Sequence, residues 1–566
     1  MSATPASLPR TPELMRPAGR SAEQLLVAVS ILVPLAGLTL FFVYPLLTIA
    51  WHSLILKDGS FGLGNYAALA TTPGILTATR NSLSVSFATT LVCIVGGFLV
   101  AFALERTRMR GTGVIRAALT LPLLAPSLVQ GLGLLFVLGR NGLVHKWTGW
   151  DINIYGFWGL LIANVFYALP QAVMILQASL RNSDARYYDA AEVMGASGWR
   201  QFFDITLPNC KFGVLSAAFV VFIVTLTDFG NAAVIGGDYR VLATEIYSQV
   251  SGQMDFGMGS VVGILLLLPS LVSIYIERVA SQRQFGSASE GLIPVRPTPA
   301  RVRDGAFGGF AWLVALLIVG LVGTVVFASF VKLWPYRMTL TLANYDITLA
   351  DGYTPLWTSL QISIAAALIG VILLFSLAFG TKRLPGGLSK AVYLLAVLPV
   401  GVPGLVIGLS YIFAFNVPGT PLYWFYGSAV LIALCNFYHY HTQGFLTMVT
   451  GMRAVPPALE EVTSCLGGHM GQVLRDAVLP FMVPTVLSVF FFLFMRSMVT
   501  LSAVIFLVTP TLNVASVSVM RLDESGFVSQ AAAFSTIIIA VVGAALLIMR
   551  AALGKLSPKL GAKGAA

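Results

Sequence analysis

The chain has 566 residues, of which 57% are hydrophobic and only 10% charged, and its net charge is +11. A soluble domain carries about 25% charged residues, so this composition excludes an ordinary water-soluble protein and indicates that a lipid bilayer surrounds most of the surface. The positive charge would suggest a nucleic-acid ligand in a soluble protein. In a membrane protein the concentration of Lys and Arg on the cytoplasmic side explains it, so no nucleic-acid partner is expected.

Apolar segments long enough to cross a bilayer, about 20 residues each, recur along the whole chain. They predict an all-α polytopic membrane protein with two parallel repeats of six helices. The expected tails are residues 1–24, which we expect to be disordered, and 554–566. A polar, proline- and arginine-rich linker is expected at 280–307. The first repeat, 25–279, has predicted spans at 25–50, 82–104, 114–138, 155–180, 212–236 and 258–279, and the second, 308–553, at 308–334, 357–381, 390–415, 426–449, 481–508 and 531–553.

The distribution of Lys and Arg predicts the orientation of these spans. If the N-terminus is cytoplasmic, 25 of the 34 basic residues fall in cytoplasmic segments, 8 fall in the outer loops, and Arg496 lies within a span. Because positive residues are retained on the cytoplasmic side, both termini and the linker are predicted to be cytoplasmic in a bacterial inner membrane.

The two halves are related in sequence. Two prolines recur at an offset of 277 residues, and residues of a later loop recur at an offset of 272. The matched pairs are Pro122 with Pro399, Pro126 with Pro403, Gln171 with Gln443, Gly195 with Gly467, and Pro208 with Pro480. Because each repeat has six spans, both have the same orientation, and we expect an axis along the membrane normal. The paired prolines predict breaks in the third and ninth spans.

A cytoplasmic loop after the fourth span of each repeat predicts two short helices separated by glycine. These loops are residues 184–208 and 455–480. The first is too polar to enter lipid, yet it is half apolar, so its apolar stripe must pack on the protein's own bundle or on a partner. The presence of such a loop in both halves favours two equivalent docking sites.

The first loop resembles the cytoplasmic loop of permeases in binding-protein-dependent type I ABC importers, the MetI-like transmembrane subunits. The shared pattern is an acid followed by two alanines, a glycine four residues later, and Ile-x-Leu-Pro after nine more. It is carried by Asp189, Ala190, Ala191, Gly195, Ile205, Leu207 and Pro208. The second loop keeps Glu461, Gly467, Leu479 and Pro480 and departs from the pattern at Val462, Thr463 and Ala477.

This resemblance implies a fused permease whose two loops carry coupling helices. Each helix would dock on one of two copies of a separate ABC ATPase subunit, and a periplasmic solute-binding protein would deliver the substrate. The chain itself lacks a Gly-x-x-x-x-Gly-Lys-Ser/Thr phosphate loop, so ATP and Mg²⁺ are expected in the partner ATPase and no cofactor or catalytic residue is expected here. No metal site is expected either, because the two histidines of the sequence from Tyr438 to His441 alternate and do not share a helix face.

Ionisable residues inside spans are costly and tend to be functional. Asp228 in the fifth span and Arg496 in the eleventh occupy corresponding spans. One interpretation places them in the translocation pathway together with Thr225, Thr227, Thr500 and Ser502. The other makes them a structural pair, or residues at helix ends, that hold the bundle together.

The sequence thus predicts the membrane-spanning permease of an ABC importer rather than an enzyme. A secondary transporter driven by an ion gradient also fits twelve spans in two repeats, but it has no need for two coupling loops. The segment from Arg496 to Leu507 resembles fused permeases assigned to 2-aminoethylphosphonate or to ferric iron. We expect 2-aminoethylphosphonate as the substrate, with ferric iron as the alternative.

Overall fold

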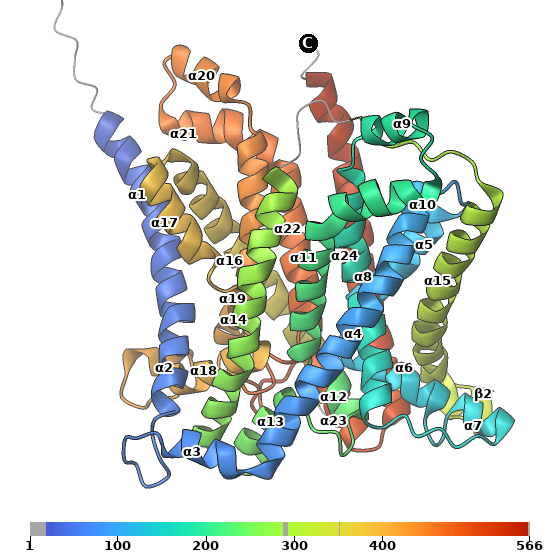
Figure 1. Cartoon of the computed structure of the whole chain (residues 1–566). Helices are drawn as coiled ribbons and strands as arrows, with labels where there is room; N and C mark the ends of the chain where they lie inside the picture. Colours follow the sequence, from blue (N-terminus) through green and yellow to red (C-terminus); the bar gives the residue numbers. More distant parts are fainter. Residues whose placement is uncertain (1–18, 287–292, 350, 564–566) are drawn as a thin grey trace, which may run out of the picture.

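The computed structural model describes residues 19–286, 293–349 and 351–563. Long helices stand side by side in one bundle (Figure 1). This all-α architecture agrees with the prediction, because a helix satisfies its backbone hydrogen bonds internally and is therefore stable in lipid. In the described residues the only strands are β1 (Val331–Leu333) and β2 (Arg337–Leu340), which form an antiparallel hairpin at one end of the bundle.

The first half contains α1 to α14, and π-helical turns interrupt or join some of them. The predicted spans correspond to α1 with α2, α4, α5 with α6, α8, α11 and α14. The bounds are α1 (Gly19–Leu38), α2 (Tyr44–His52), α3 (Gly64–Thr71), α4 (Pro73–Arg106), α5 (Thr112–Thr120), α6 (Leu128–Leu138), α7 (Leu143–Thr148), α8 (Phe157–Arg181), α9 (Ala185–Val193), α10 (Gly198–Gln201), α11 (Leu207–Leu226), α12 (Gly230–Ile235), α13 (Leu242–Tyr247) and α14 (Phe256–Gly286).

The second half repeats this order from α15 to α24. Its spans are α15, α16, α17 with α18, α19, α22 and α24. The bounds are α15 (Arg301–Ser329), α16 (Thr354–Arg383), α17 (Gly386–Val397), α18 (Gly404–Phe415), α19 (Ala429–Ala454), α20 (Pro457–Cys465), α21 (Met470–Gln472), α22 (Leu479–Val499), α23 (Ala515–Glu524) and α24 (Val528–Lys563).

By length and composition, nine helices of the described chain could cross a membrane, and four shorter apolar helices accompany them. Some of the shorter ones belong to broken spans. The third predicted span is interrupted between α5 and α6, around Pro122 and Pro126, and the ninth between α17 and α18, around Pro399 and Pro403. The breaks expected from the paired prolines are therefore present in both halves.

The fifth and eleventh spans were predicted to extend too far toward their C-terminal ends. Helix α11 ends at Leu226, not near residue 236, and α22 ends at Val499, not near residue 508. In each case the chain leaves the helix and then forms a short helix, α12 or α23. Hydropathy could not show these ends, because the segments beyond them are apolar and are buried in protein rather than in lipid.

The ends of the expected tail and linker also differ from the prediction. Residues 19–24 already belong to α1, α14 extends to Gly286, and α15 begins at Arg301. The rest of the N-terminal tail (1–18), part of the linker (287–292) and the last residues (564–566) lie outside the described residues.

The first span of each half packs against the opposite half. Helix α1 contacts α16, and α2 contacts α18, whereas α15 contacts α4, α5 and α6. Figure 1 shows this exchange, with α1 beside α16 and α17 at one side and α15 beside α4 and α5 at the other. The other spans pack mainly within their own half, as α4, α8 and α11 do in the first and α16, α19 and α22 in the second, although α14 also contacts α18 and α24 contacts α6. The exchange makes the two halves one bundle.

Candidate functional site

The first predicted coupling loop forms two helices that meet at Gly195. Helix α9 begins after Asp184, whose carboxylate accepts the backbone N–H of Arg186 at 3.0 Å. The Arg186 side chain also binds this carboxylate and holds the pKa of Asp184 below its usual value. The helix ends at Val193, and the chain turns at Gly195, where φ is +74°, a conformation that glycine adopts without strain. A short α10 and a π-helical turn, Phe202–Thr206, then lead directly into α11.

The outer surface of this loop is strongly apolar. Its large exposed side chains have exposed fractions between 56% and 89%. A soluble, unpartnered surface rarely presents such a group of neighbours. They are Val193, Met194, Trp199 and Phe203. Asp189 and Ala190 are also exposed, whereas Ala191 is buried.

The second loop has the same construction. Helix α20 ends at Cys465, and the chain turns at Gly467, where φ is +79°. Helix α21 is followed by a π-helical turn, Val473–Val478, that leads into α22. The two π-helical turns lie at matching positions of the repeats, at the offset of 272 residues. Leu466, which matches Met194, has an exposed fraction of 83%. The degraded second motif therefore still folds into the predicted shape.

Both loops are fastened to the bundle at their bases. In the first half the Arg106 guanidinium lies 5.1 Å from the ring centre of Tyr188 in α9 and donates to the Leu180 carbonyl at 2.9 Å. In the second half the equivalent Arg383 donates to Glu460, the equivalent of Tyr188, at 2.9 Å. The contacts differ in chemistry but join the same two elements. The orientation of each coupling helix thus depends on the end of the second span of its own half.

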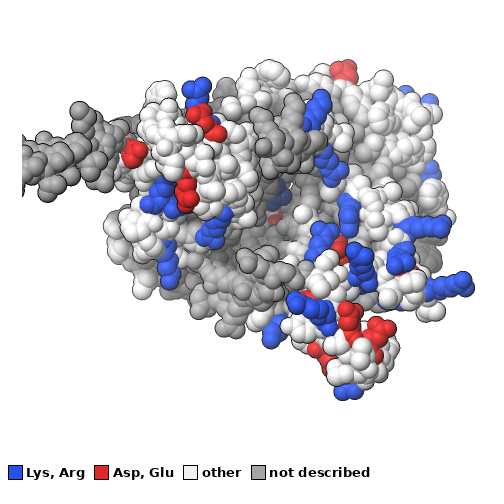
Figure 2. Space-filling model, turned by 90° about the horizontal axis from the view of Figure 1, so that it is seen from above, with Lys and Arg blue, Asp and Glu red and all other residues white. Residues whose placement is uncertain are grey.

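The two loops lie on one face of the molecule, which we call the coupling face and define by α9, α10, α20 and α21. Figure 1 shows these helices at the same end, beside the end of α24. Figure 2 looks onto this face, where Lys and Arg gather around a hollow between the two sides. The linker returns to the same face, because the Ala185 N–H donates to the Ile293 carbonyl at 2.9 Å.

Beyond the end of α11 lies Asp228, which is half-buried. Its carboxylate accepts the Asn231 backbone N–H at 3.0 Å. The Asn231 side chain donates to Asn164 of α8 at 3.0 Å. Asp228 therefore holds the first turn of α12, which Asn231 joins to α8.

Arg496, in the last turn of α22, lies in a set of aromatic side chains from both halves. Its guanidinium is 4.8 Å from the ring centre of Tyr440 of α19, and it is near enough to Tyr167 of α8 to interact with it electrostatically. Tyr440 also accepts a hydrogen bond from Thr500 at 2.9 Å. His439 is near enough for Arg496 to act on it electrostatically. Asp228 is likewise near enough to Tyr167 to act on it electrostatically. We call Tyr167, Asp228, His439, Tyr440, Arg496 and Thr500 the polar centre.

The structure separates the predicted pathway residues into two groups. Asp228, Arg496 and Thr500 belong to the polar centre, but no ion pair joins the described side chains of Asp228 and Arg496, so the two are not a directly bonded pair. The other three residues lie near them in the chain, and the Thr225 carbonyl accepts the Asp228 backbone N–H at 3.3 Å. Thr225 is buried, the Thr227 hydroxyl donates to its own helix at Ile223, and Ser502 packs against Gly404.

Sequence reasoning missed Tyr167, His439 and Tyr440 as companions of Arg496. The alternating sequence from Tyr438 to His441 was visible, and the 272-residue offset pairs Tyr167 with His439. Those two signals together would have placed an aromatic residue from each half at the centre. Among the described residues, no three His, Cys, Asp or Glu side chains gather into a metal site.

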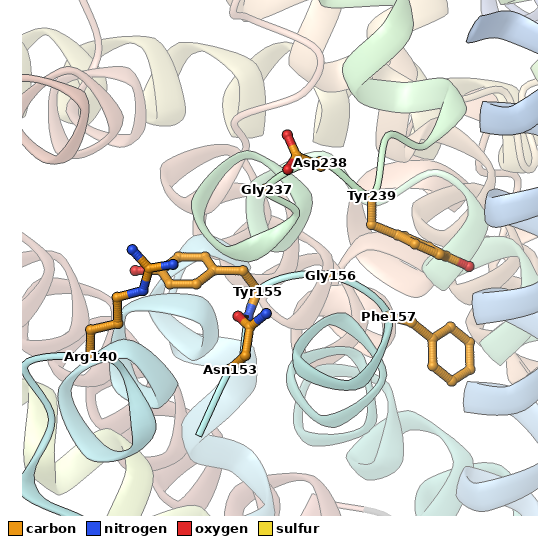
Figure 3. A pocket seen from close by; sticks show the side chains of 8 residues that line it. All are labelled: Arg140, Asn153, Tyr155, Gly156, Phe157, Gly237, Asp238 and Tyr239. Atoms are coloured by element: carbon orange, nitrogen blue, oxygen red, sulfur yellow. Dashed lines mark hydrogen bonds between the residues drawn. The ribbon is translucent and has the colours of Figure 1, made fainter. Parts of the chain in front are cut away.

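The opposite face contains a cavity of about 660 Å³. It lies where the chain enters α8 and where it leaves α12, and Figure 3 shows its lining. The Arg140 guanidinium is 5.9 Å from the ring centre of Tyr155, and Asp238 and Tyr239 come from the loop after α12. This cavity is thus polar and lies at the ends of the helices that reach the polar centre from the first half.

These features define a class: a polytopic membrane protein with paired helix–glycine–helix loops on one face and a polar centre between two repeats. Residues 93–285 match the family described as binding-protein-dependent transport system inner membrane component. The chain belongs to this family, and it is the permease subunit of an ABC importer of the inner membrane.

Its similarity to full-length relatives extends over most of the chain. It is 31% identical to a putative ferric transport system permease protein, FbpB 1, of Haemophilus influenzae, over 83% of this chain and 76% of that protein. It is 30% identical to the ferric transport system permease protein FbpB of Actinobacillus pleuropneumoniae, over 90% of this chain and 75% of the relative.

A shorter relative shows how much of the chain one permease unit needs. The molybdenum transport system permease protein ModB of Haemophilus influenzae is 30% identical, and the match covers 38% of this chain but 98% of that protein. A whole permease of this family therefore corresponds to less than half of the present chain, as expected if two such units are fused.

Proposed function

We propose that this chain forms the complete translocation pathway of a ferric iron importer, powered by two ATPase subunits that dock on its coupling face. The proposal rests on the direct connection between each coupling loop and the polar centre. Each coupling loop passes through a π-helical turn into the helix, α11 or α22, that ends at the polar centre. A displacement of either loop is therefore transmitted along one helix to Asp228 or Arg496.

The exposed apolar side chains of the loops support the docking role. Val193, Met194 and Leu466 project from the ends of α9 and α20, just before a glycine turn that leaves space around it. ATP binding and hydrolysis would take place in the partner subunits. The chain itself would couple the movements of the ATPase to the membrane helices and would form the path for the substrate. A periplasmic binding protein would deliver the solute to the opposite face, where the cavity beside Arg140 and Tyr155 is open to it.

The substrate is inferred from the relatives. Two of the three long matches carry names of ferric transport permeases, and the third is named only as a probable ABC transporter permease. Ferric iron, the alternative at the level of sequence, is therefore favoured over 2-aminoethylphosphonate.

One observation keeps the phosphonate as a second candidate. Arg496 places a positive charge in the polar centre, and a guanidinium suits an anionic phosphonate group better than a bare cation. If ferric iron is the substrate, this charge favours passage as a complex with an anion.

A pair of uptake measurements distinguishes the candidates. A strain deleted for this gene would be tested for uptake of radioactive ferric iron and for growth on 2-aminoethylphosphonate as sole phosphorus source. We expect loss of the iron uptake alone, restored by the gene on a plasmid. Loss of phosphonate growth with normal iron uptake would contradict the proposed substrate but leave the permease assignment intact.

The orientation is proposed on the charge distribution, with both termini and the coupling face in the cytoplasm. Reporter fusions after Arg303 and at Ala566 should both read as cytoplasmic. A periplasmic reading at either site would overturn the orientation and, with it, the docking of a cytoplasmic ATPase. Copurification of the complex with tagged ATPase, followed by mass measurement, would test the ratio of two ATPase subunits to one permease chain.

A further inference from the structure

A second cavity, of about 480 Å³, opens on the coupling face within the second half. It lies between the ends of α16 and α19 and the beginning of α17. Three basic side chains line it: Lys382, Lys390 and Arg453. Apolar side chains, including Val449 and Tyr393, form the remainder of the wall.

The first half fills the corresponding position with an ion cluster. There Glu105 accepts hydrogen bonds from Gln177 at 3.0 Å, Arg181 at 2.8 Å and Arg116 at 3.3 Å. These four residues come from α4, α8 and α5, which are the counterparts of α16, α19 and α17. The two arginines of this cluster therefore share a carboxylate, Glu105, that lies between them.

The repeat offsets identify the substitutions that empty the site in the second half. By the offset of 277, Glu105 corresponds to Lys382 and Arg116 to Tyr393; by the offset of 272, Gln177 corresponds to Val449 and Arg181 to Arg453. All four counterparts line the cavity. The second half has thus lost the central acid and replaced it with a base, while it has kept the arginine that bound the acid.

The resulting charge is not balanced within the protein. Glu460 is shared by Lys382 at 2.8 Å and Arg383 at 2.9 Å. Within the described chain neither Lys390 nor Arg453 forms an ion pair. Four cations thus lie in or beside the cavity with a single carboxylate, which is the environment that an anion would stabilise.

We infer that this cavity binds the phosphate headgroup of an anionic phospholipid. Its basic side chains lie at the ends of membrane-spanning helices, where lipid headgroups lie, and its apolar wall suits the glycerol and the first acyl carbons. A bound lipid takes the place that Glu105 has in the first half. Because Lys382 also binds Glu460 of α20, the headgroup would lie directly beside the base of the second coupling helix.

Thermal unfolding of the purified permease in neutral detergent tests this inference. The probes are phosphatidylglycerol, phosphatidylcholine and inorganic phosphate at equal concentration. We expect phosphatidylglycerol to raise Tm, and the other two to leave it unchanged. An equal rise with phosphatidylcholine would overturn the inference, and an equal rise with inorganic phosphate would replace the lipid by a small free anion.

Two kinds of variant assign the effect to the cavity. The double variant Lys390→Gln/Arg453→Gln should at least halve the shift caused by phosphatidylglycerol. The matched control Arg200→Gln/Lys211→Gln removes the same charge from the coupling face outside the cavity and should keep the full shift. An unchanged shift in the first variant, or an equal loss in both, would contradict the site.

A third variant restores an internal acid. Val449→Glu places a carboxylate where the first half has Gln177, so it should offset part of the positive charge of the cavity and weaken the response to phosphatidylglycerol. Val449→Gln has nearly the same shape without the charge and should keep the response. These experiments measure lipid binding alone, so their failure would leave the proposed transport function untouched.

Discussion

Arg383 and Glu460 join the end of α16 to the second coupling helix, with 2.9 Å between Nη2 and Oε2. The contact is largely shielded, since the side chains have exposed fractions of 11% and 23%. Lys382 binds the other carboxylate oxygen at 2.8 Å. The acid thus receives a cation on each oxygen, and it fixes α20 at the site where we propose that an ATPase docks.

Glu460→Ala should release α20 from α16 and leave Arg383 without its carboxylate. We expect a loss of about 1.5 kcal/mol in stability, because hydrogen bonds between charged groups contribute at this level when partly shielded. Association with the ATPase should fall as well, while membrane insertion stays normal. Thermal unfolding and copurification measure the two effects. Glu461→Ala, on the exposed side of the same helix, is the control for stability and should leave Tm unchanged.

Gly195→Asp should disturb docking without preventing folding. A Cβ at this position meets no atom within 4 Å, so the cost to the fold is the backbone strain at φ +74°, about 1 kcal/mol. The new side chain projects from the coupling face, and we expect copurification with the ATPase and uptake to fall together. Gly467→Asp should have a milder effect, since the second motif is degraded.

A matched glycine on the other side of the protein separates strain from docking. Gly59 has φ +81° and also meets no atom within 4 Å, but it lies in the loop before α3 at the opposite face. Gly59→Asp should therefore carry the same strain and keep normal association with the ATPase. If it reduced association as much as Gly195→Asp does, the coupling role of Gly195 would be refuted.

Hydropathy and proline positions predicted part of this fold from the sequence alone. The twelve apolar runs were sufficient for the all-α bundle, and paired prolines correctly placed the breaks in the third and ninth spans. Hydropathy failed at Leu226 and Val499, where an apolar chain leaves the helix inside the protein. A window average cannot distinguish apolar side chains that face lipid from those that pack against neighbouring helices.

Part of the candidate site could likewise be predicted from the sequence, and part of it could not. The helix, glycine turn and helix of each coupling loop followed from local sequence, because Gly195 and Gly467 determine the turn. The polar centre did not, since Tyr167 and Arg496 meet across the two halves, far apart in sequence. Only the packing of α8 and α22 brings such residues together, and a single sequence does not contain that information.

Asp228→Asn and Arg496→Gln should each insert and fold but transport poorly. In the first variant the new side-chain amide oxygen can still accept the Asn231 N–H, and the two native residues form no ion pair whose loss would strand a charge. We expect uptake to fall by about tenfold in each single variant, equivalent to about 1.4 kcal/mol. The double variant should show no recovery of uptake or of Tm. Recovery in the double variant would instead indicate that the two charges stabilise each other.

The last prediction concerns the contact between the broken third span and the start of α12, which the two halves build in opposite ways. An added Cβ at Gly230 would lie 2.4 Å from the Ser127 hydroxyl oxygen and 2.8 Å from the Leu128 nitrogen. In the second half the counterparts exchange roles, with Gly404 against Ser502, where an added Cβ at Gly404 would lie 2.3 Å from the hydroxyl oxygen. Each contact has room for one hydroxymethyl group.

Gly230→Ser should therefore destabilise the protein by about 1–3 kcal/mol, the usual cost of overpacking. Adding Ser127→Gly copies the arrangement of the second half and should recover part of the loss in Tm and in expressed level. The recovery stays partial, because the Leu128 backbone remains close to residue 230. Ser127→Gly alone is the control and should cost less than Gly230→Ser. A double variant no more stable than Gly230→Ser would show that the contacts of the two halves are not interchangeable. The Leu128 backbone, rather than the Ser127 side chain, would then be what excludes a larger residue at position 230.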